Sequence, residues 1–229
     1  MDESFVVRSL RQCALFKRVD EGALLHVARH LRRRRFRRNE VIFHQGDPGD
    51  SLHVVVSGSV KVVLPSAEGE EAIIATLRPG DFFGELSLLD GSPRSATVMA
   101  LDAAETMALP RSVFHELLDK DPGLRDALLE GLAHELRRLT GHVEELHFLD
   151  LAGRLAMRLT RLAREMDPTS AEVRLDWPYT QSDLASMIGG TRQSVNRLLS
   201  GLVDDGLVVI ERDTLIIPDV EALRGKAER

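Results

Sequence analysis

Residues 84–98, which read GELSLLDGSPRSATV, decide the fold because they gather in one short loop what a small phosphorylated ligand needs. Gly84 lets the backbone approach an anion closely, and the residues after it predict one helical turn with free amide groups. Arg94 supplies a planar guanidinium that can neutralise a phosphate. The carboxylate of Glu85 would repel a phosphate unless it accepts hydrogen bonds from hydroxyl groups of the same ligand. A ribose phosphate satisfies both side chains, and we call residues 84–98 the phosphate cradle.

The cradle resembles the phosphate-binding cassette of cyclic-nucleotide-binding domains, in the form found in the catabolite activator/FNR family of bacterial transcription regulators. The resemblance implies that Glu85 holds the ribose 2′-hydroxyl and that Arg94 and Ser95 hold the cyclic phosphate. It also implies that the backbone of Gly84 and Glu85 lines the floor of the site. The ligand-binding residues predicted within the cradle are Gly84, Glu85, Leu86, Ser87, Arg94 and Ser95. The alternative is an ordinary β-turn with a surface arginine.

Length and composition indicate two modest globular domains. The chain has 229 residues, 43% of them hydrophobic and 29% charged, which is enough for each domain to bury a core. No apolar run reaches membrane-spanning length, and Met1–Ser4 lacks the basic start of a signal peptide. We therefore expect a soluble cytoplasmic protein with no membrane partner.

Cysteine content and net charge narrow the choice of function. Cys13 is the only cysteine, so one chain cannot form an internal disulfide or the four-cysteine iron–sulfur site with which the FNR branch senses oxygen. We expect Cys13 to be a buried small side chain. The formal net charge of −6 argues against nucleic-acid binding through bulk charge, so any DNA contact must be local.

Short apolar runs over residues 37–109 predict an antiparallel β-roll. Turns rich in glycine and proline separate the runs, as short strands in a meander require. Loops gather at the ends of such a roll, and the cradle is one of them. The basic run Arg32–Arg38 invites a nucleic-acid interpretation. We favour instead a strand that begins there, with solvated arginines around an inward Phe36, followed by a turn in which Asn39 has a positive φ.

A long helix follows the roll and carries a coiled-coil pattern. The sequence from Ser112 to Phe148 has a helical period, with one break at Asp121-Pro122-Gly123. Apolar residues after the break recur with the a/d spacing of a two-helix seam. These residues are Leu132, Leu136, Leu139, Val143 and Leu146. We predict that the helix pairs with its copy in a parallel homodimer; packing of the stripe against the roll alone is the alternative.

From Leu149 onward the sequence predicts a winged helix-turn-helix domain. The predicted elements are a helix over 150–165, a strand over 173–175, a helix after Thr180, a helix over 192–205 and wing strands over 207–210 and 214–217. Thr180 and Asp183 have the spacing of a capping box, and Thr191 caps the second helix. Gly189-Gly190 makes the turn between them. Two short helices joined by a glycine turn form a helix-turn-helix.

The second of these helices is predicted to read DNA. Arginine can bond bidentately to guanine and glutamine to adenine, whereas threonines at helix starts can contact phosphates. The segment TRQSVNR, residues 191–197, is similar to the recognition helix of the same family, with Gln193 where the catabolite activator has Glu. We expect a related but shifted palindromic site. The predicted DNA-binding residues are Thr180, Thr191, Arg192, Gln193, Ser194, Asn196 and Arg197.

The segment FLDLAGR, residues 148–154, matches the family's hinge between sensor and DNA-binding domains. Counting back from it places Leu139 and Thr140 where cyclic-AMP-responsive members have a Thr and a Ser that contact the adenine. Thr140 can replace the serine hydroxyl, but Leu139 cannot hydrogen-bond a base. We therefore rank three candidates for the effector. The first is cyclic AMP held mainly by its ribose phosphate, the second is another cyclic nucleotide, and the third is a pocket whose ligand is no longer required.

These features predict an α+β fold in three parts: a β-roll sensor over 1–116, a dimerisation helix over 117–148 and a winged helix-turn-helix domain over 149–229. The expected function is that of a homodimeric transcription regulator that binds palindromic double-stranded DNA in response to a cyclic nucleotide. RNA polymerase is a further expected partner, and no obligatory cofactor is expected.

Two other classes remain open. An enzyme is conceivable because His26 and His30 have a metal-ligand spacing on a helix, but no third ligand is evident. We therefore expect neither a metal site nor catalytic residues. A haem-based gas sensor of the same fold would show a Soret absorbance band. A nucleotide-binding module without DNA contact would not need Arg192 and Arg197.

Overall fold

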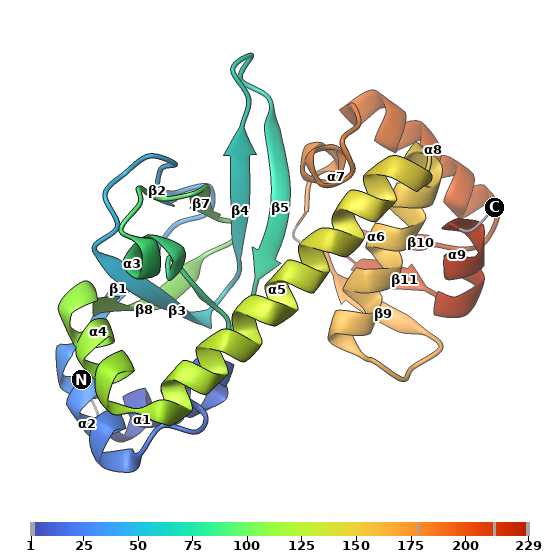
Figure 1. Cartoon of the computed structure of the whole chain (residues 1–229). Coiled ribbons are helices and arrows are strands. Elements are labelled where there is room, and N and C mark those ends of the chain that lie inside the picture. The colour runs from blue at the N-terminus through green and yellow to red at the C-terminus, as the bar shows by residue number, and fades with distance from the viewer. Residues whose placement is uncertain (1–2, 178, 213, 228–229) are drawn as a thin grey trace. The chain divides into compact units, whose positions relative to one another are not determined.

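The structure is a computed structural model that describes residues 3–177, 179–212 and 214–227. The chain divides into two compact units, Met1–Arg137 and Arg138–Arg229. The long helix α5, Pro122–Phe148, contributes residues to both units (Figure 1). The first unit holds both four-stranded sheets together with helices, and helices make up most of the second unit, so the predicted α+β class is confirmed. The predicted three-part division stays a prediction.

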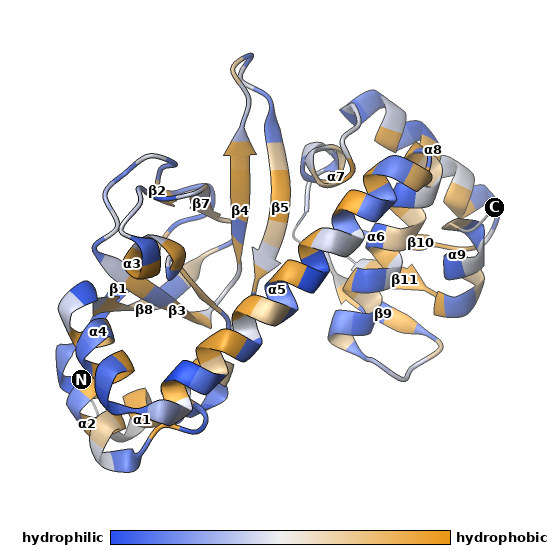
Figure 2. Cartoon of the chain, in the orientation of Figure 1, coloured by the Kyte–Doolittle hydropathy of each residue, from blue (hydrophilic) through white to orange (hydrophobic). Residues whose placement is uncertain are grey.

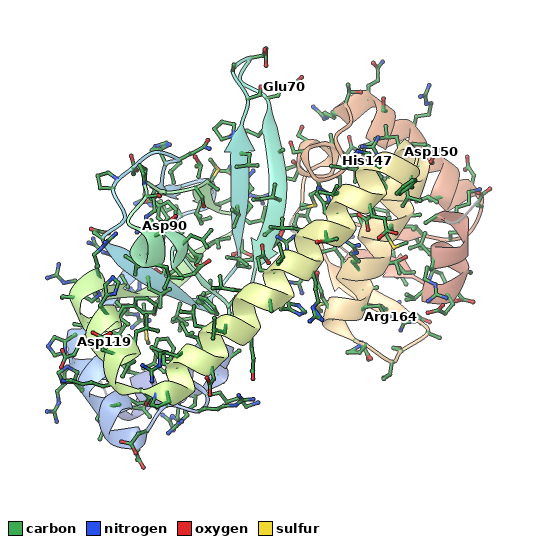
Figure 3. The ribbon with its side chains drawn as sticks, in the orientation of Figure 1. Glu70, Asp90, Asp119, His147, Asp150 and Arg164 are labelled. Carbon is green, nitrogen blue, oxygen red and sulfur yellow. The ribbon has the colours of Figure 1, made fainter. Side chains whose placement is uncertain are left out.

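Among the described residues, two four-stranded antiparallel sheets, with strand orders β1-β8-β3-β6 and β2-β7-β4-β5, form the first unit. Their strands are β1 Arg32–Phe36, β2 Val41–Phe43, β3 Ser51–Ser57, β4 Val60–Pro65, β5 Glu71–Leu77, β6 Phe82–Phe83, β7 Thr97–Ala100 and β8 Ala104–Pro110. Buried side chains from both sheets, among them Val55, Phe83 and Val98, pack into one cluster. The predicted antiparallel roll is confirmed. Glu70, labelled in Figure 3, lies at the tip of the hairpin between β4 and β5.

The basic run contains the predicted strand as β1, Arg32–Phe36, which lies at the edge of its sheet. All four arginines of β1 are exposed, and Phe36 is half-buried against the cluster between the sheets. Side chains alternate across a strand, so Arg33 and Arg35 share one face. Both pair with the buried carboxylate of Glu105 on the neighbouring strand β8. Asn39 has the predicted positive φ, of 64°.

Helices cover one side of the roll with a second buried cluster (Figure 1). They are α1 Glu3–Gln12, a 3₁₀ turn Ala14–Phe16, α2 Glu21–His30, α4 Arg111–Lys120 and the first turns of α5. Cys13 lies fully buried in this cluster, and burial raises the pKa of its thiol to about 11. The predicted small core side chain is confirmed. The break between α4 and α5 falls at Asp121, whose carboxylate accepts a hydrogen bond from the Leu124 amide at 3.0 Å.

The apolar stripe of α5 changes character along the helix. Leu124 and Leu128 are buried in the helical cluster, and Leu132 packs against it half-buried. Beyond this point the stripe reaches the surface, where Figure 2 shows apolar residues recurring along α5. The exposed large apolar residues of α5 are Leu129, Leu136, Leu139, Val143, Leu146 and Phe148. Leu129, which the sequence prediction did not include, lies before Leu132 and is also exposed, so it continues the predicted seam toward the N-terminus.

The second unit is a winged helix. Its elements are α6 Leu151–Met166, β9 Val173–Asp176, α7 Gln181–Ile188, α8 Arg192–Asp204, β10 Val209–Glu211, β11 Thr214–Ile217 and α9 Val220–Ala227. Within the described residues, β10, β11 and β9 form one antiparallel sheet. Asp150 caps α6 through the Gly153 amide at 2.7 Å, and Arg164 lies in its last turn; both are labelled in Figure 3.

Two details of this unit correct the sequence prediction. The wing begins at Val209 rather than Leu207, because the Leu207 amide donates to the Leu202 carbonyl and belongs to the end of α8. Helix α9 was not predicted; Val220 and Leu223 are fully buried, and the helix packs on α6. Across the part of the chain that the structure describes, none of the helices is long and apolar enough to cross a membrane.

Candidate ligand and DNA sites

The cradle begins at a glycine that no other residue can replace without strain. Gly84 has φ 87°, and a Cβ atom there would lie 2.5 Å from Arg94 Nη1. The chain then forms the predicted turn as α3, Leu86–Asp90, which ends at Gly91 in the left-handed conformation. Asp90, labelled in Figure 3, accepts a hydrogen bond from the Ser92 amide at 2.9 Å and so fixes the exit from the helix.

Arg94 is buried inside the cradle rather than presented as an open fork. Only 4% of its surface is exposed. Nη1 donates to the Gly84 carbonyl at 2.8 Å and to Ser87 Oγ at 3.1 Å, while Nη2 donates to the Ser51 carbonyl at 2.8 Å. Its Cζ lies 4.2 Å from the ring centroid of Phe43, a cation–π distance. The buried Nε has no hydrogen-bond partner in the described part of the chain.

The connection between β2 and β3 holds the backbone of Arg94 in place. The Arg94 amide donates to the Asp47 carbonyl at 2.9 Å, and the Gly46 amide donates to the Arg94 carbonyl at 2.9 Å. Gln45 adds a contact to the Ser95 carbonyl at 3.2 Å. The sequence had marked this segment only as a turn, because its contacts with the cradle join positions about fifty residues apart.

The remaining predicted ligand residues differ in exposure. Ser87 is 2% exposed and Glu85 is half-buried, whereas Leu86 and Ser95 are exposed. Burial raises the pKa of the Glu85 carboxyl, and the Glu135 carboxylate on α5 raises it further. The structure therefore brings Gly84, Glu85, Ser87 and Arg94 together, with Ser95 next in sequence at the surface. Leu139 and Thr140 belong to the second compact unit, where both are exposed.

A buried histidine beside Arg94 was missed by sequence reasoning. His53 is 7% exposed, and its ring stacks on Phe83 with centroids 5.0 Å apart. Its Nδ1 lies 3.1 Å from Thr106 Oγ1, and its Nε2 lies 3.2 Å from Ser51 Oγ. Burial, with a smaller contribution from the Arg94 charge, lowers the pKa of His53 to about 4. The ring is therefore neutral at pH 7.

The helix-turn-helix has the predicted caps. Thr180 Oγ1 accepts from the Asp183 amide at 3.1 Å, and the Asp183 carboxylate accepts from the Thr180 amide at 2.9 Å. Gly189 ends α7 with φ 68°. Thr191 Oγ1 then caps α8 by accepting from the Ser194 amide at 3.1 Å. Side-chain caps, reciprocal at α7 and one-directional at α8, fix where each helix starts, which explains why both starts were predicted correctly.

Helix α8 has one buried face and one polar exposed face. Val195, Leu199 and Leu202 are buried. Of the predicted DNA-binding residues, Ser194 is half-buried and the others, Thr180, Thr191, Arg192, Gln193, Asn196 and Arg197, are exposed. The Asn196 side chain accepts a hydrogen bond from Gln181 on α7, so its amide oxygen is engaged within the domain. Arg192, Gln193 and Arg197 are thus exposed and carry hydrogen-bonding groups of the kind that read base edges in a major groove.

Comparison with known proteins defines the class. The cyclic nucleotide-binding domain family matches residues 33–121, and the Crp-like helix-turn-helix domain family matches residues 153–225. A sensor domain of this kind followed by such a DNA-binding domain defines a transcription regulator and not an enzyme. The chain belongs to the CRP/FNR family of transcription regulators, as both its domain content and its relatives show.

Relatives span nearly the whole chain. A "CRP-like cAMP-activated global transcriptional regulator" of Mycobacterium tuberculosis is 29% identical over 219 residues, 95% of this chain and 98% of that protein. The "cAMP-activated global transcriptional regulator Vfr" of Pseudomonas aeruginosa is 33% identical over 192 residues, 82% and 90% of the two chains. These matches confirm the predicted family.

Solved structures confirm the fold. FixK2 from Bradyrhizobium japonicum superposes with a TM-score of 0.76 at 22% identity, over 85% of this chain and 96% of that one. The c-di-GMP responsive global regulator CLP of Xanthomonas campestris superposes with a TM-score of 0.74 at 25% identity, over 86% and 99%.

Proposed function

We propose that the protein is a homodimeric regulator whose binding to palindromic DNA is controlled by a cyclic nucleotide held in the phosphate cradle. The observation that carries the proposal is Arg94, a buried guanidinium next to Gly84 and Glu85 inside a cyclic-nucleotide-binding domain. A buried guanidinium is stable only with hydrogen-bond acceptors or an anion beside it. Carbonyl groups are the acceptors of its terminal nitrogens, and its unpaired Nε–H is a donor that an anion could use.

The ligand half of the proposal assigns a role to each cradle residue. Arg94 and Ser95 bind the cyclic phosphate, and Glu85 accepts a hydrogen bond from the ribose 2′-hydroxyl. The buried Nε–H of Arg94 has no acceptor among the described residues. Leaving such a donor unpaired costs about 1–3 kcal/mol, which a phosphate oxygen would offset. The weak 3.5 Å contact between Arg94 and the exposed Asp50 is the one that a phosphate displaces most easily.

Cyclic AMP is the proposed effector, held mainly through its ribose and phosphate. Both relatives named above are described as cAMP-activated. One specific residue favours a second candidate, another cyclic nucleotide, because Leu139 offers no hydrogen bond with which to recognise adenine. The similar structure of a c-di-GMP responsive regulator belongs to this alternative. A protein that acts without a ligand, or with haem, comes after these two.

The dimer half of the proposal rests on α5. Its exposed apolar residues continue the a/d spacing from Leu129 to Leu146, and a second copy of the same helix is the partner that this spacing fits. A two-fold dimer also matches a palindromic DNA site, with one recognition helix for each half-site. As a transcription regulator, the protein would act on RNA polymerase at promoters in the cytoplasm.

The DNA half assigns base reading to Arg192, Gln193 and Arg197 on α8. Thr180 and Thr191 lie at the starts of the two helices and are assigned phosphate contacts, together with Ser194 and Asn196 on α8. Gln193 can accept and donate a hydrogen bond, unlike a glutamate, so the half-site differs at the base pair that it reads.

Titration calorimetry with cyclic AMP, cyclic GMP and cyclic di-GMP tests the ligand assignment. We expect heat from at least one of the three, strongest for cyclic AMP, with one site per chain. Absence of heat with all three nucleotides would rule out the cradle as a cyclic-nucleotide site. A Soret band in the purified protein would favour haem instead.

A further inference from the structure

A second arginine, Arg111, hydrogen-bonds both to the cradle and to the connection between β2 and β3 that contacts it. Arg111 is the first residue of α4 and is half-buried. Its Nε donates to the Gly49 carbonyl at 3.1 Å, in the connection between β2 and β3. Its Nη2 donates to the Ser87 carbonyl in α3. The Arg111 amide also donates to the Asp50 carbonyl at 2.8 Å.

The position of Arg111 is unfavourable for α4 itself. A cation in the first turn of a helix opposes the helix dipole, at a typical cost of about 0.3–1 kcal/mol. The N-cap residue, Pro110, makes no side-chain cap. An arginine at this position is thus not explained by the stability of α4. Residues that are unfavourable for their own element tend to occur where a functional site gains from them, and the hydrogen bonds of Arg111 go to the cradle and to the connection beside it.

Ser87 links Arg111 to Arg94. Its carbonyl accepts from Arg111, and its hydroxyl accepts from Arg94 Nη1 at 3.1 Å. Gly49 closes against the same residue, since a Cβ atom on Gly49 would lie 2.3 Å from Ser87 Oγ. Arg111 thus clamps the Gly49 backbone against Ser87, and Ser87 in turn orients the guanidinium of Arg94.

We propose that Arg111 is a positioning residue of the nucleotide site: its guanidinium fork holds the 44–50 connection against α3 and thereby sets the position of Arg94. This role rests on the proposed function of the cradle. Arg111 itself touches no ligand. The role needs two donors in a fixed plane, which lysine cannot supply.

Hydrogen exchange without added nucleotide tests the clamp directly. The variants are Arg111→Gln, Arg111→Lys and the control Arg11→Gln. Arg11 is a matched control because its Nη1 also joins two backbone carbonyls, those of Lys17 and Val19, at 3.0 and 2.8 Å. We expect both Arg111 variants to speed amide exchange in residues 44–50 and 84–91 together, because the hydrogen bonds that join the two segments are lost. The expected increase is about tenfold or more, and each tenfold change in the opening equilibrium corresponds to about 1.4 kcal/mol. Unchanged exchange in either segment would overturn the proposal.

Calorimetry with cyclic AMP gives the second readout. We expect Arg111→Gln and Arg111→Lys to weaken cyclic AMP binding by about ten- to a hundredfold, because misplacing a binding group by about 1 Å can have an effect of that size. We expect Arg11→Gln to leave the affinity unchanged. Wild-type affinity in Arg111→Lys would show that charge alone suffices and would contradict the clamp. An equal loss in Arg11→Gln would assign the effect to general stability instead.

The two proposals fail in different ways. If the wild-type protein binds none of the cyclic nucleotides, the proposed function fails, and hydrogen exchange still decides the role of Arg111. If the wild type binds and the Arg111 variants bind equally well, only the Arg111 inference fails.

Discussion

Arg94 is a buried charged side chain whose hydrogen bonds are compatible with the phosphate contact proposed for it. Its two terminal nitrogens bond to the neutral carbonyl groups of Gly84 and Ser51, and the exposed carboxylate of Asp50 lies 3.5 Å from Nη2, so its positive charge is solvated and only weakly countered. Burial lowers the pKa of the guanidinium, yet arginine stays protonated in proteins. The charge at the base of the cradle is therefore held in place by the protein itself, as the proposed phosphate role requires.

Replacing Arg94 tests this role. We expect Arg94→Ala to weaken cyclic AMP binding by about a hundredfold or more, since a charge-assisted contact is lost. The carbonyl groups of Gly84 and Ser51 would also lose their donor, which should lower the free energy of unfolding by about 1–3 kcal/mol. Calorimetry and thermal melts measure the two effects. Arg32→Ala, at an exposed position on β1, should change neither; unaltered nucleotide affinity in Arg94→Ala would refute the assignment.

His53 predicts a pH dependence of stability. Its pKa in the folded protein is about 4, below the ordinary value of 6.5, so the unfolded chain takes up the proton first as pH falls. The contribution of neutral His53 to stability is thus complete above about pH 6.5 and is lost as pH falls toward 4. The stability lost through this pKa shift is on the order of 3 kcal/mol.

The measurement is the free energy of unfolding between pH 4 and 7.5 for the wild type and His53→Gln. The difference in free energy of unfolding between the wild type and His53→Gln should shrink toward low pH. Glu85 acts in the opposite direction, because its raised pKa favours the folded state at low pH, but it is present in both proteins and its contribution cancels in the difference. Parallel pH profiles would contradict the neutral buried ring.

At the residue scale the sequence predicted the parts of the site that are local. Gly84, Glu85 and Arg94 stand within one loop, and their chemistry is visible from their spacing. Arg111 reaches the same loop from α4, and His53 on β3 stacks on Phe83 directly before it, through pairings that only the folded roll creates. No local signal marks such residues.

At the element scale the prediction to test is the seam on α5. Leu136→Glu would place two carboxylates in one apolar interface, which we expect to weaken the dimer by about a hundredfold or more. Arg137→Glu adds the same side chain one position outside the seam and should leave the dimer intact. Light scattering over a concentration series gives the molar mass. A monomeric wild type, or a dimeric Leu136→Glu, would contradict the proposed seam.

Elements were predictable where their own sequence carried caps or a repeat. Helices α7 and α8 were predicted because Thr180 and Thr191 cap them, and α5 because its apolar period is long. Helices α1 and α9 were not, because both are short and are stabilised by burial of a few side chains, such as Val6 and Leu223, where α1 packs on α2 and α9 packs on α6. Tertiary packing of this kind leaves little trace in a short window.

At the scale of the whole molecule, the cradle lies in one compact unit and the recognition helix in the other, and α5 contributes to both. A ligand can shift the DNA-binding equilibrium only through a difference in its affinity for two conformations. If the nucleotide raises the affinity of the protein for DNA by a certain factor, linkage requires that DNA raise the affinity for the nucleotide by the same factor, typically about 5- to 150-fold. The family and the order of its domains were evident from the sequence, because the cradle, the hinge and the recognition helix each carry a local pattern.

The most direct measurement is the affinity of the protein for its own palindromic site, selected from a random duplex library, with and without saturating cyclic AMP. Fluorescence anisotropy at fixed salt is suitable, because affinity for DNA depends steeply on ionic strength. We predict that cyclic AMP tightens wild-type binding by about tenfold or more and leaves Arg94→Ala unchanged. Equal affinity of the wild type with and without the nucleotide would contradict control of DNA binding by the cradle.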